Sequence, residues 1–395
     1  MKQSKHFSKK GMEDFHAFET RTFHKLQLIM SLCVFFFSLF LTSSLGWAAP
    51  STAKKNWDDV VLAAQKEGTV NLYAGWGPKT RTMLTEAFGK KYGITLNLTP
   101  FARESEMLAK VTTERAANMR VADVFGGGTS TLMLGLKPAG FLGKIESLIM
   151  MPDIMDKKTW LGGQGLPFAD KDRTTVGMLG VVLHNVIYNT SQIRKDQLTS
   201  YKDILKPEFK GKIVLDDPTN SGSGNAFMAH LAYNLWNEDE AINYLKRLIE
   251  LGVVIERDKR ILVESVARGK YSIGLGPYRE MFTQFIDEGA PIGVPTLTEP
   301  LAASASAGGL GVAIEPAHPN ATIVFVNWLL SREGQSQLAR SFLVASTRLD
   351  SSKEGINPMF IPKQGQKLYW DTEEMIRGKG RMMTLTKDIL DKTTK

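Results

Sequence analysis

The sequence predicts an α/β protein of two lobes, each a mostly parallel sheet flanked by helices. Short apolar, β-branched runs alternate strictly with amphipathic helical segments, and this alternation stops and then resumes in the second half. The length of 395 residues exceeds what one compact domain usually holds. Hydrophobic residues at 43% and charged residues at 23% are typical of a folded chain.

The first half alternates between the two kinds of element up to residue 137. In residues 78–92, Leu84 and Phe88 share one helical face, and Gly93 follows as a stop signal. Helices are expected at 54–66, 78–92, 105–117 and 129–137, and strands at 70–73, 94–98 and 121–125. A stretch rich in Gly, Pro and Asp at 150–173 interrupts the pattern.

The second half repeats the architecture without repeating the sequence. Residues 175–188 form a long apolar, β-branched run. Helices are expected at 238–250, 260–268 and 279–288, and strands at 271–275 and 292–294. No flexible tether separates the halves, so extended strands are expected to join the lobes.

Residues 1–48 are predicted to be a secretory signal peptide. Residues 1–25 carry a net charge of +3, residues 26–41 are almost wholly apolar, and the small residues Gly46 and Ala48 precede the expected cleavage point. The apolar run is shorter than the roughly 20 residues that a membrane span prefers. A cleaved leader predicts a periplasmic protein, and a retained membrane anchor is the alternative.

Composition and motifs exclude several classes of function. The one cysteine, Cys33, lies in the leader, which excludes a disulfide framework and cysteine metal clusters. The net charge of +8 falls once the leader is removed, and no basic stripe with interleaved aromatics predicts nucleic-acid binding. No Gly-x-Ser-x-Gly elbow, Walker loop or His-Glu-x-x-His motif occurs. We therefore expect no catalytic residue, no enzyme activity and no cofactor; an exported hydrolase using Asp216 or Asp217 is the alternative.

Ligand-binding residues are expected where Gly, Ser or Thr follows a strand and begins a helix. In open α/β sheets ligands bind at the carboxyl ends of strands, and helix N-termini there offer free N–H groups that suit anions. Five segments fit this pattern. Their candidates are Trp76, Gly77, Arg103, Ser105, Gly128, Thr129, Ser130, Ser221, Ser223, Tyr278 and Arg279.

Four stretches resemble periplasmic substrate-binding proteins of ABC transporters, in the extracellular solute-binding branch that includes the ferric-iron binders. They are residues 70–94, 121–142, 186–224 (with YKDILKPEFKGKIVLDDPTNSGSG) and 325–339 (FVNWLLSREGQSQLA). The resemblance implies a type II-like periplasmic-binding-protein fold with the ligand cleft between lobes. Lobe one would hold 57–173 and 291–348, and lobe two 174–290 and 349–395. The implied partners are a small solute and an inner-membrane permease, and a monomer is expected.

One departure from the family bears on the ligand. The ferric binders carry adjacent tyrosines where this chain reads Gly276-Pro277-Tyr278-Arg279. Only Tyr278 remains, and the positive charge beside it opposes a metal cation. The sequence therefore favours an organic or oxyanionic solute. Ferric iron, with Tyr278 as a metal ligand, is the alternative within the class, and a membrane-anchored sensor is the alternative outside it.

Overall fold

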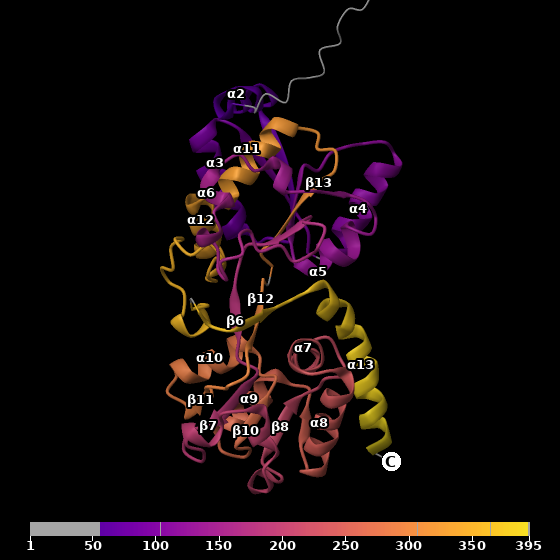
Figure 1. The fold of residues 1–395 in the computed structure, drawn as a ribbon, viewed down its shortest axis with the longest axis vertical. Helices are drawn as coiled ribbons and strands as arrows, with labels where there is room; N and C mark the ends of the chain where they lie inside the picture. The colour runs from indigo at the N-terminus through magenta and orange to yellow at the C-terminus, as the bar shows by residue number, and fades with distance from the viewer. Residues whose placement is uncertain (1–55, 103, 306, 364, 394–395) are drawn as a thin grey trace, which may run out of the picture. The chain divides into compact units, whose positions relative to one another are not determined.

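The computed structural model describes residues 56–393, except residues 103, 306 and 364. The predicted signal peptide lies outside the described residues. Helices surround two β-sheets, and a third, smaller sheet joins these two (Figure 1). None of the helices in this described part has the length and apolarity that crossing a membrane requires.

The first sheet has the strand order β2-β1-β3-β13-β4, with β5 also paired to β13. Strands β1, β2 and β3 are parallel, whereas β13 is antiparallel to its partners. The strands are β1 (Thr69–Ala74), β2 (Thr95–Pro100), β3 (Val124–Gly127), β4 (Leu142–Gly143), β5 (Thr175–Gly177) and β13 (Gly309–Ala313). Its helices are α2 (Trp57–Glu67), α3 (Pro78–Tyr92), α4 (Glu104–Ala116), α5 (Thr129–Thr131), α6 (Pro152–Met155), α11 (Pro319–Leu330) and α12 (Arg332–Phe342). The short π-helix η1 (Leu132–Leu136) continues α5, and η2 (Glu146–Leu148) and η3 (Lys157–Thr159) are short 3₁₀ helices.

The second sheet has the order β11-β7-β10-β8-β9, in which β8, β9 and β10 are parallel and β7 is antiparallel to β10 and β11. The strands are β7 (Val186–Asn189), β8 (Ile213–Asp216), β9 (Val254–Glu256), β10 (Ile273–Leu275) and β11 (Ile292–Gly293). Its helices are α7 (Ser223–His230), α8 (Glu238–Glu250), α9 (Lys259–Ala267), α10 (Arg279–Asp287) and α13 (Glu373–Thr393), with the turns η4 (Lys195–Gln197), η5 (Tyr201–Leu205), η6 (Pro207–Phe209) and η7 (Leu231–Leu235).

The third sheet lies where the chain passes between the other two. Its strands are β6 (Val181–Leu183), β12 (Leu301–Ser304) and β14 (Leu368–Trp370), and the short turn η8 (Pro358–Phe360) precedes β14. Strand β6 leads from the first sheet to the second, β12 leads back, and β14 leads to α13, which packs on α7 and α8. Three extended connections thus join the two larger sheets.

Several predicted elements are confirmed at their ends, because their signals are local. The helices expected at 78–92 and 238–250 have those bounds. Gly93 caps the end of α3, and its φ of 69° lies in the left-handed region that glycine adopts freely. Strand β5 still pairs within the first sheet, and β11 still pairs within the second. The chain therefore leaves the first sheet after residue 177 and the second sheet after residue 293.

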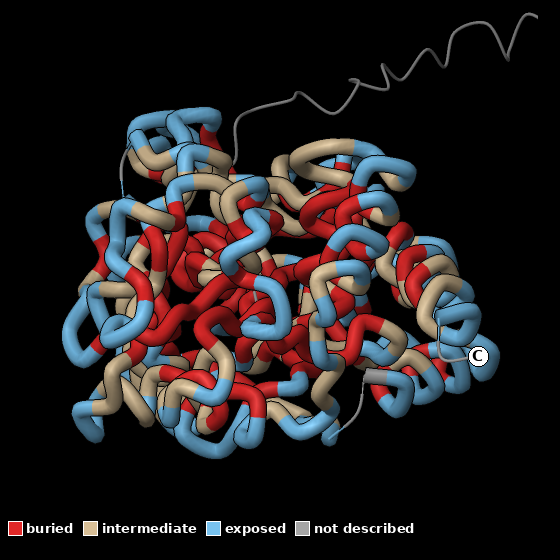
Figure 2. The backbone as a smooth tube through the Cα atoms, turned by 90° about the horizontal axis from the view of Figure 1, so that it is seen from below, coloured by how far each residue is buried: buried red, intermediate tan, exposed pale blue. Residues whose placement is uncertain are grey.

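Aromatic packing fastens helices from both ends of the chain onto the first sheet. Phe88 of α3 lies edge-on to Phe325 of α11 at 5.1 Å between ring centroids, and 5.2 Å from Trp328. All three side chains are fully buried. Figure 2 shows buried segments running through the interior, with exposed segments around them. The late helices α11 and α12 therefore complete a core that the first strands begin.

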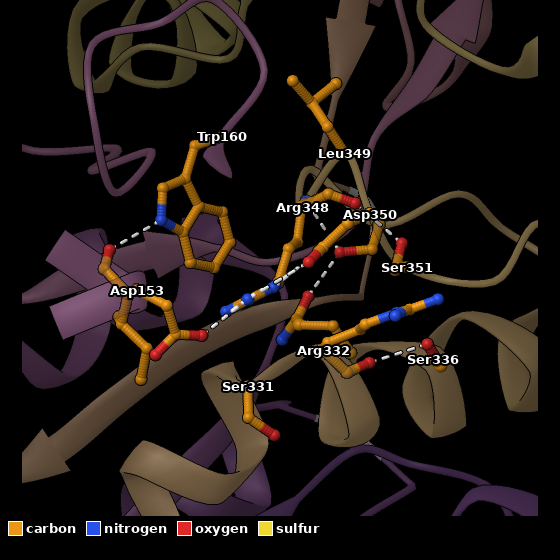
Figure 3. Close-up of polar contacts among 12 residues, drawn as sticks. Asp153, Trp160, Ser331, Arg332, Ser336, Arg348, Leu349, Asp350 and Ser351 are labelled. Carbon is orange, nitrogen blue, oxygen red and sulfur yellow. Dashed lines mark hydrogen bonds and ion pairs between the residues drawn. The ribbon is translucent and has the colours of Figure 1, made fainter. Parts of the chain in front are cut away.

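A buried arginine joins three segments near these late helices (Figure 3). Arg348, only 3% exposed, donates to Asp153 at 2.6 Å, to Asp350 at 2.8 Å and to the carbonyl oxygen of Leu330 at 3.0 Å. Its guanidinium also lies 5.9 Å from the centroid of the Trp160 ring. The planar guanidinium group presents several N–H donors in fixed directions, so it can donate to all of these oxygens at once. The compact ammonium group of a lysine does not have this geometry.

Replacing Arg348 with lysine is expected to lower the free energy of unfolding by about 2 kcal/mol, because the charge remains while at least one charge-assisted hydrogen bond is lost. Denaturant unfolding measures the difference. The exposed Arg332, shown in Figure 3, provides the control, since Arg332→Lys should change stability by less than about 0.5 kcal/mol. Equal free energies of unfolding for the two variants would show that the guanidinium geometry of Arg348 contributes nothing to stability.

Candidate functional site

A cavity of about 340 Å³ lies beside the carboxyl ends of the parallel strands in the second sheet. Its walls come from the starts of α7, α9 and α10, from strands β6 and β12, from α13 and from Asp371 in the segment before α13. Ligand pockets commonly have volumes of about 300 to 1,000 Å³. The cavity is therefore large enough for a small solute.

Two glycines allow α7 and α10 to begin close together at this cavity. A Cβ atom on Gly224 would lie 2.1 Å from the backbone oxygen of Asp216. Gly276 has a φ of 63°, and a Cβ atom there would lie 2.9 Å from the Cα atom of Gly224. Only glycine permits such an approach of two backbones. The two helix N-termini therefore open into one cavity.

Asp216 and Asp217 hold the loop before α7. Asp216 accepts a hydrogen bond from the Gly224 amide at 2.7 Å, and burial raises the pKa of its carboxyl group. Asp217 accepts from the amide and hydroxyl of Thr219 and from Arg257. Although its burial acts in the opposite direction, these bonds lower the pKa of Asp217. Neither aspartate lines the cavity, so their contacts are those of a structural turn.

Three cationic side chains line the cavity. The ammonium group of Lys259 lies 4.5 Å from the centroid of the Tyr278 ring, and no carboxylate pairs with Lys259 among the residues that the structure describes. Arg279 forms an ion pair with its neighbour Glu280, with 3.0 Å between Nε and Oε1. Lys379 lies 3.5 Å from a carboxylate oxygen of Asp371. Lys259 is therefore the lining cation without an ion pair in the described part of the chain, although its charge also acts on the carboxyl group of Asp216.

Helix N-termini add hydrogen-bond donors to this wall. The amides of Gly222 and Ser223, at the start of α7, have no hydrogen-bond partner within the described ranges. Arg279 is the first residue of α10, and Lys259 is the first residue of α9. A helix N-terminus carries a partial positive charge and favours anions. The amides and the lysine thus present the same sign of charge to the cavity.

The lining offers little to a metal cation. No group of three or more His, Cys, Asp or Glu side chains that could hold a metal occurs in the described part of the chain. His184 lines the cavity, but burial lowers its pKa, and its Nε2 atom lies 3.0 Å from the Met359 carbonyl oxygen. Tyr278, at 39% exposed, remains as a phenol that faces the cavity with Lys259 above its ring.

The cavity brings together three of the residues predicted from the sequence, which are Ser223, Tyr278 and Arg279. Ser221 is exposed and lies outside the lining. Lys259, Asp371 and Lys379 were missed. Lys259 follows Asp258, which caps α9 through the amides of Arg260 and Ile261, so a helix start after a strand was a signal that the sequence contained. The positions of Asp371 and Lys379 had no such local signal.

The candidates on the first sheet do not line this cavity. Trp76 is 2% exposed and its indole N–H donates to the Ala307 carbonyl at 2.9 Å, so its position is that of a core residue. Thr129 is also buried. Gly128 is half-buried, whereas Gly77, Ser105 and Ser130 are exposed at helix starts, and Arg103 lies outside the described residues. These loops form no second wall of the cavity described above.

Comparison with known proteins identifies relatives in sequence and in fold. The profile of a family described as bacterial extracellular solute-binding proteins matches residues 150–365, more than half of the chain. A protein of Haemophilus influenzae whose function is uncharacterised is 24% identical over 265 residues, which are 64% of this chain and 69% of the relative.

Many solved structures share the fold, and two of them show its range of ligands. One is the Trichodesmium protein IdiA (FutA) in complex with iron and citrate, with a TM-score of 0.62, 19% identity and coverage of 82% of this chain and 99% of that chain. The other is AfuA, a periplasmic binding protein of Actinobacillus pleuropneumoniae with exogenous fructose-6-phosphate bound; its TM-score is 0.53 at 22% identity, over 82% of this chain and 98% of that chain. These likenesses show the two-lobed α/β fold of periplasmic binding proteins, which confirms the predicted fold class.

Proposed function

Because the chain belongs to the bacterial extracellular solute-binding protein family, we propose that it is the exported receptor of an ABC importer and that its solute is a small organic anion. Proteins of this kind bind a solute and hand it to a membrane permease, and they catalyse no reaction. The proposed binding site is the cavity lined by Ser223, Lys259, Tyr278 and Arg279. Residues 1–48 would serve as the export signal and be removed.

Lys259 carries this proposal, because it forms no ion pair with a carboxylate among the residues that the structure describes. An ammonium group with no carboxylate partner within the described residues is stabilised when an anion binds beside it. The free amides at the start of α7 point to the same class of ligand, since a half-buried anion gains from both the charge and the N–H donors. The fold of AfuA, with its bound sugar phosphate, accommodates such a ligand.

Ferric iron is the second candidate, because Tyr278 supplies a phenol and the similar Trichodesmium protein was solved with iron and citrate. Phenolate oxygen is a hard ligand that suits a hard cation. Lys259 and Arg279 disfavour this candidate, since both place positive charge next to the phenol. We therefore place iron second. Gly77, Ser105 and Ser130 remain candidates for contacts from the first sheet.

The experiment is a thermal-shift screen of the purified exported protein followed by calorimetry. The panel contains phosphate esters, carboxylates, inorganic phosphate, ferric chloride and ferric citrate. A specific ligand at one hundred times its Kd stabilises the folded protein by about 2.7 kcal/mol. We expect stabilisation by an organic anion without consumption of that anion. Stabilisation by ferric iron alone, with a visible phenolate-to-iron absorption band, would replace the proposal with the iron receptor.

A further inference from the structure

The charges of the side chains that line the cavity nearly cancel. This near balance restricts the number of charged groups on the ligand, and not only the sign of its charge. Lys259, Arg279 and Lys379 are cationic, whereas Glu280 and Asp371 are carboxylates, so the lining carries one surplus positive charge, which the carboxyl group of Asp216 offsets in part. His184 adds none, because burial lowers its pKa and favours the neutral form. A ligand with many anionic groups would therefore meet lining carboxylates as well as cations.

Asp371 is a largely buried lining carboxylate that still has capacity to accept a hydrogen bond. Its side chain is 12% exposed and lies in the lining, where Ser304 donates to one oxygen and Lys379 lies near the other. A carboxylate has about four lone-pair sites, so these two contacts leave acceptor capacity unused. A ligand that covered this oxygen pair without donating a hydrogen bond would desolvate it without compensation.

From these observations we infer that the solute carries a single anionic group together with a hydrogen-bond donor, a hydroxyl or ammonium group, which Asp371 accepts. This inference rests on the proposed function, since it assigns the anionic group to Lys259 and the helix N-termini. Asp371 is then the residue that determines whether the protein prefers an anion with a hydroxyl or ammonium group over an alkyl anion without one.

The size of the cavity supports contact with both groups at once. Its volume of about 340 Å³ lies at the small end of the range of about 300 to 1,000 Å³ that is common for ligand pockets. A compound of that size reaches the walls on several sides when bound. Lys259 from the start of α9 and Asp371 from the segment before α13 line the same space, so a molecule that fills the cavity contacts both.

The test compares ligands that differ only in the donor group. One series is n-propyl phosphate, glycerol 3-phosphate and 3-aminopropyl phosphate; the other is butyrate, 3,4-dihydroxybutyrate and 4-aminobutyrate. Calorimetry on the wild type should show that a hydroxyl- or ammonium-bearing member binds at least about tenfold more tightly than the alkyl member of its series. The series that responds identifies the anion as a phosphate or a carboxylate.

The variant Asp371→Asn provides the readout that a merely structural role would not give. Asparagine retains an acceptor for Ser304 but removes a negative charge. We expect the preference for the donor-bearing member to fall below about threefold, while the alkyl member binds as well as before or more tightly. Glu280→Gln is the matched control, since it removes the other lining carboxylate and should strengthen both members alike.

The outcomes separate the inference from the function on which it rests. Equal affinities for alkyl and donor-bearing members in the wild type, or an unchanged preference in Asp371→Asn, would overturn the inference and leave an organic-anion receptor standing. Failure of every member of both series to bind, with a folded protein verified by its thermal unfolding, would overturn both.

Discussion

Alanine in place of Gly224 is expected to lower the free energy of unfolding by more than about 3 kcal/mol and to abolish binding in the cavity. The added Cβ atom would lie 2.1 Å from the backbone oxygen of Asp216 and 2.7 Å from its carbonyl carbon. Backbone atoms at the end of a buried strand cannot rotate away, so β8 or α7 must move. Because α7 begins at Ser223, that movement displaces the amides that face the cavity. Denaturant unfolding and calorimetry measure the two effects.

Gly222→Ala is the matched control, two residues earlier in the same loop. Its φ of 171° is extended backbone that alanine also adopts, and the nearest neighbour of the added Cβ atom would be a side-chain oxygen of Asp216 at 3.6 Å. The unfolding free energy should change by less than about 1 kcal/mol. If Gly224→Ala has the same free energy of unfolding as the wild type, the close approach of α7 to β8 is not what fixes the start of α7 at the cavity.

Much of the fold follows from local sequence patterns. Helix 78–92 has its apolar residues on one face and a glycine behind it, and these signals do not depend on distant residues. Strands β12 and β13 were not predicted, because their short segments, Leu-Ala-Ala-Ser and Gly-Leu-Gly-Val-Ala, have few β-branched residues and form strands through partners far away in the chain. Long-range pairing of this kind leaves no periodic signal.

The sequence predicted those residues of the candidate site that follow a strand along the chain. Ser223, Tyr278 and Arg279 lie at the starts of helices that follow strands of the second sheet, where helix N-termini converge. Asp371 and Lys379 reach the cavity only because the third connection carries α13 back onto α7, and no local pattern encodes that path. Trp76 also follows a strand, yet it is buried because its ring packs beside Gly126 and Phe342. A position after a strand thus identifies a candidate binding residue. The packing around that residue determines whether it lines a cavity or lies in the core.

Substituting methionine for Lys259 is expected to weaken binding of the organic anion by about 30-fold, while Tyr278→Phe weakens it only a few-fold. Methionine retains the apolar stem beside the tyrosine ring but removes the one lining cation without a carboxylate partner in the described residues. Phenylalanine removes a hydroxyl group and keeps the ring. Calorimetry with the ligand found in the screen compares the two variants with the wild type.

Lys270 offers the control for Lys259. Its ammonium group lies 5.2 Å from the Tyr271 ring centroid, a similar cation–ring pair, but neither residue lines the cavity. Lys270→Met should therefore leave affinity unchanged. A ferric site requires the reverse order, because Tyr278→Phe would delete a metal ligand and Lys259→Met would remove a charge that repels the metal. If Tyr278→Phe abolishes binding and Lys259→Met binds as well as the wild type, Tyr278 is a metal ligand and the anion proposal is wrong.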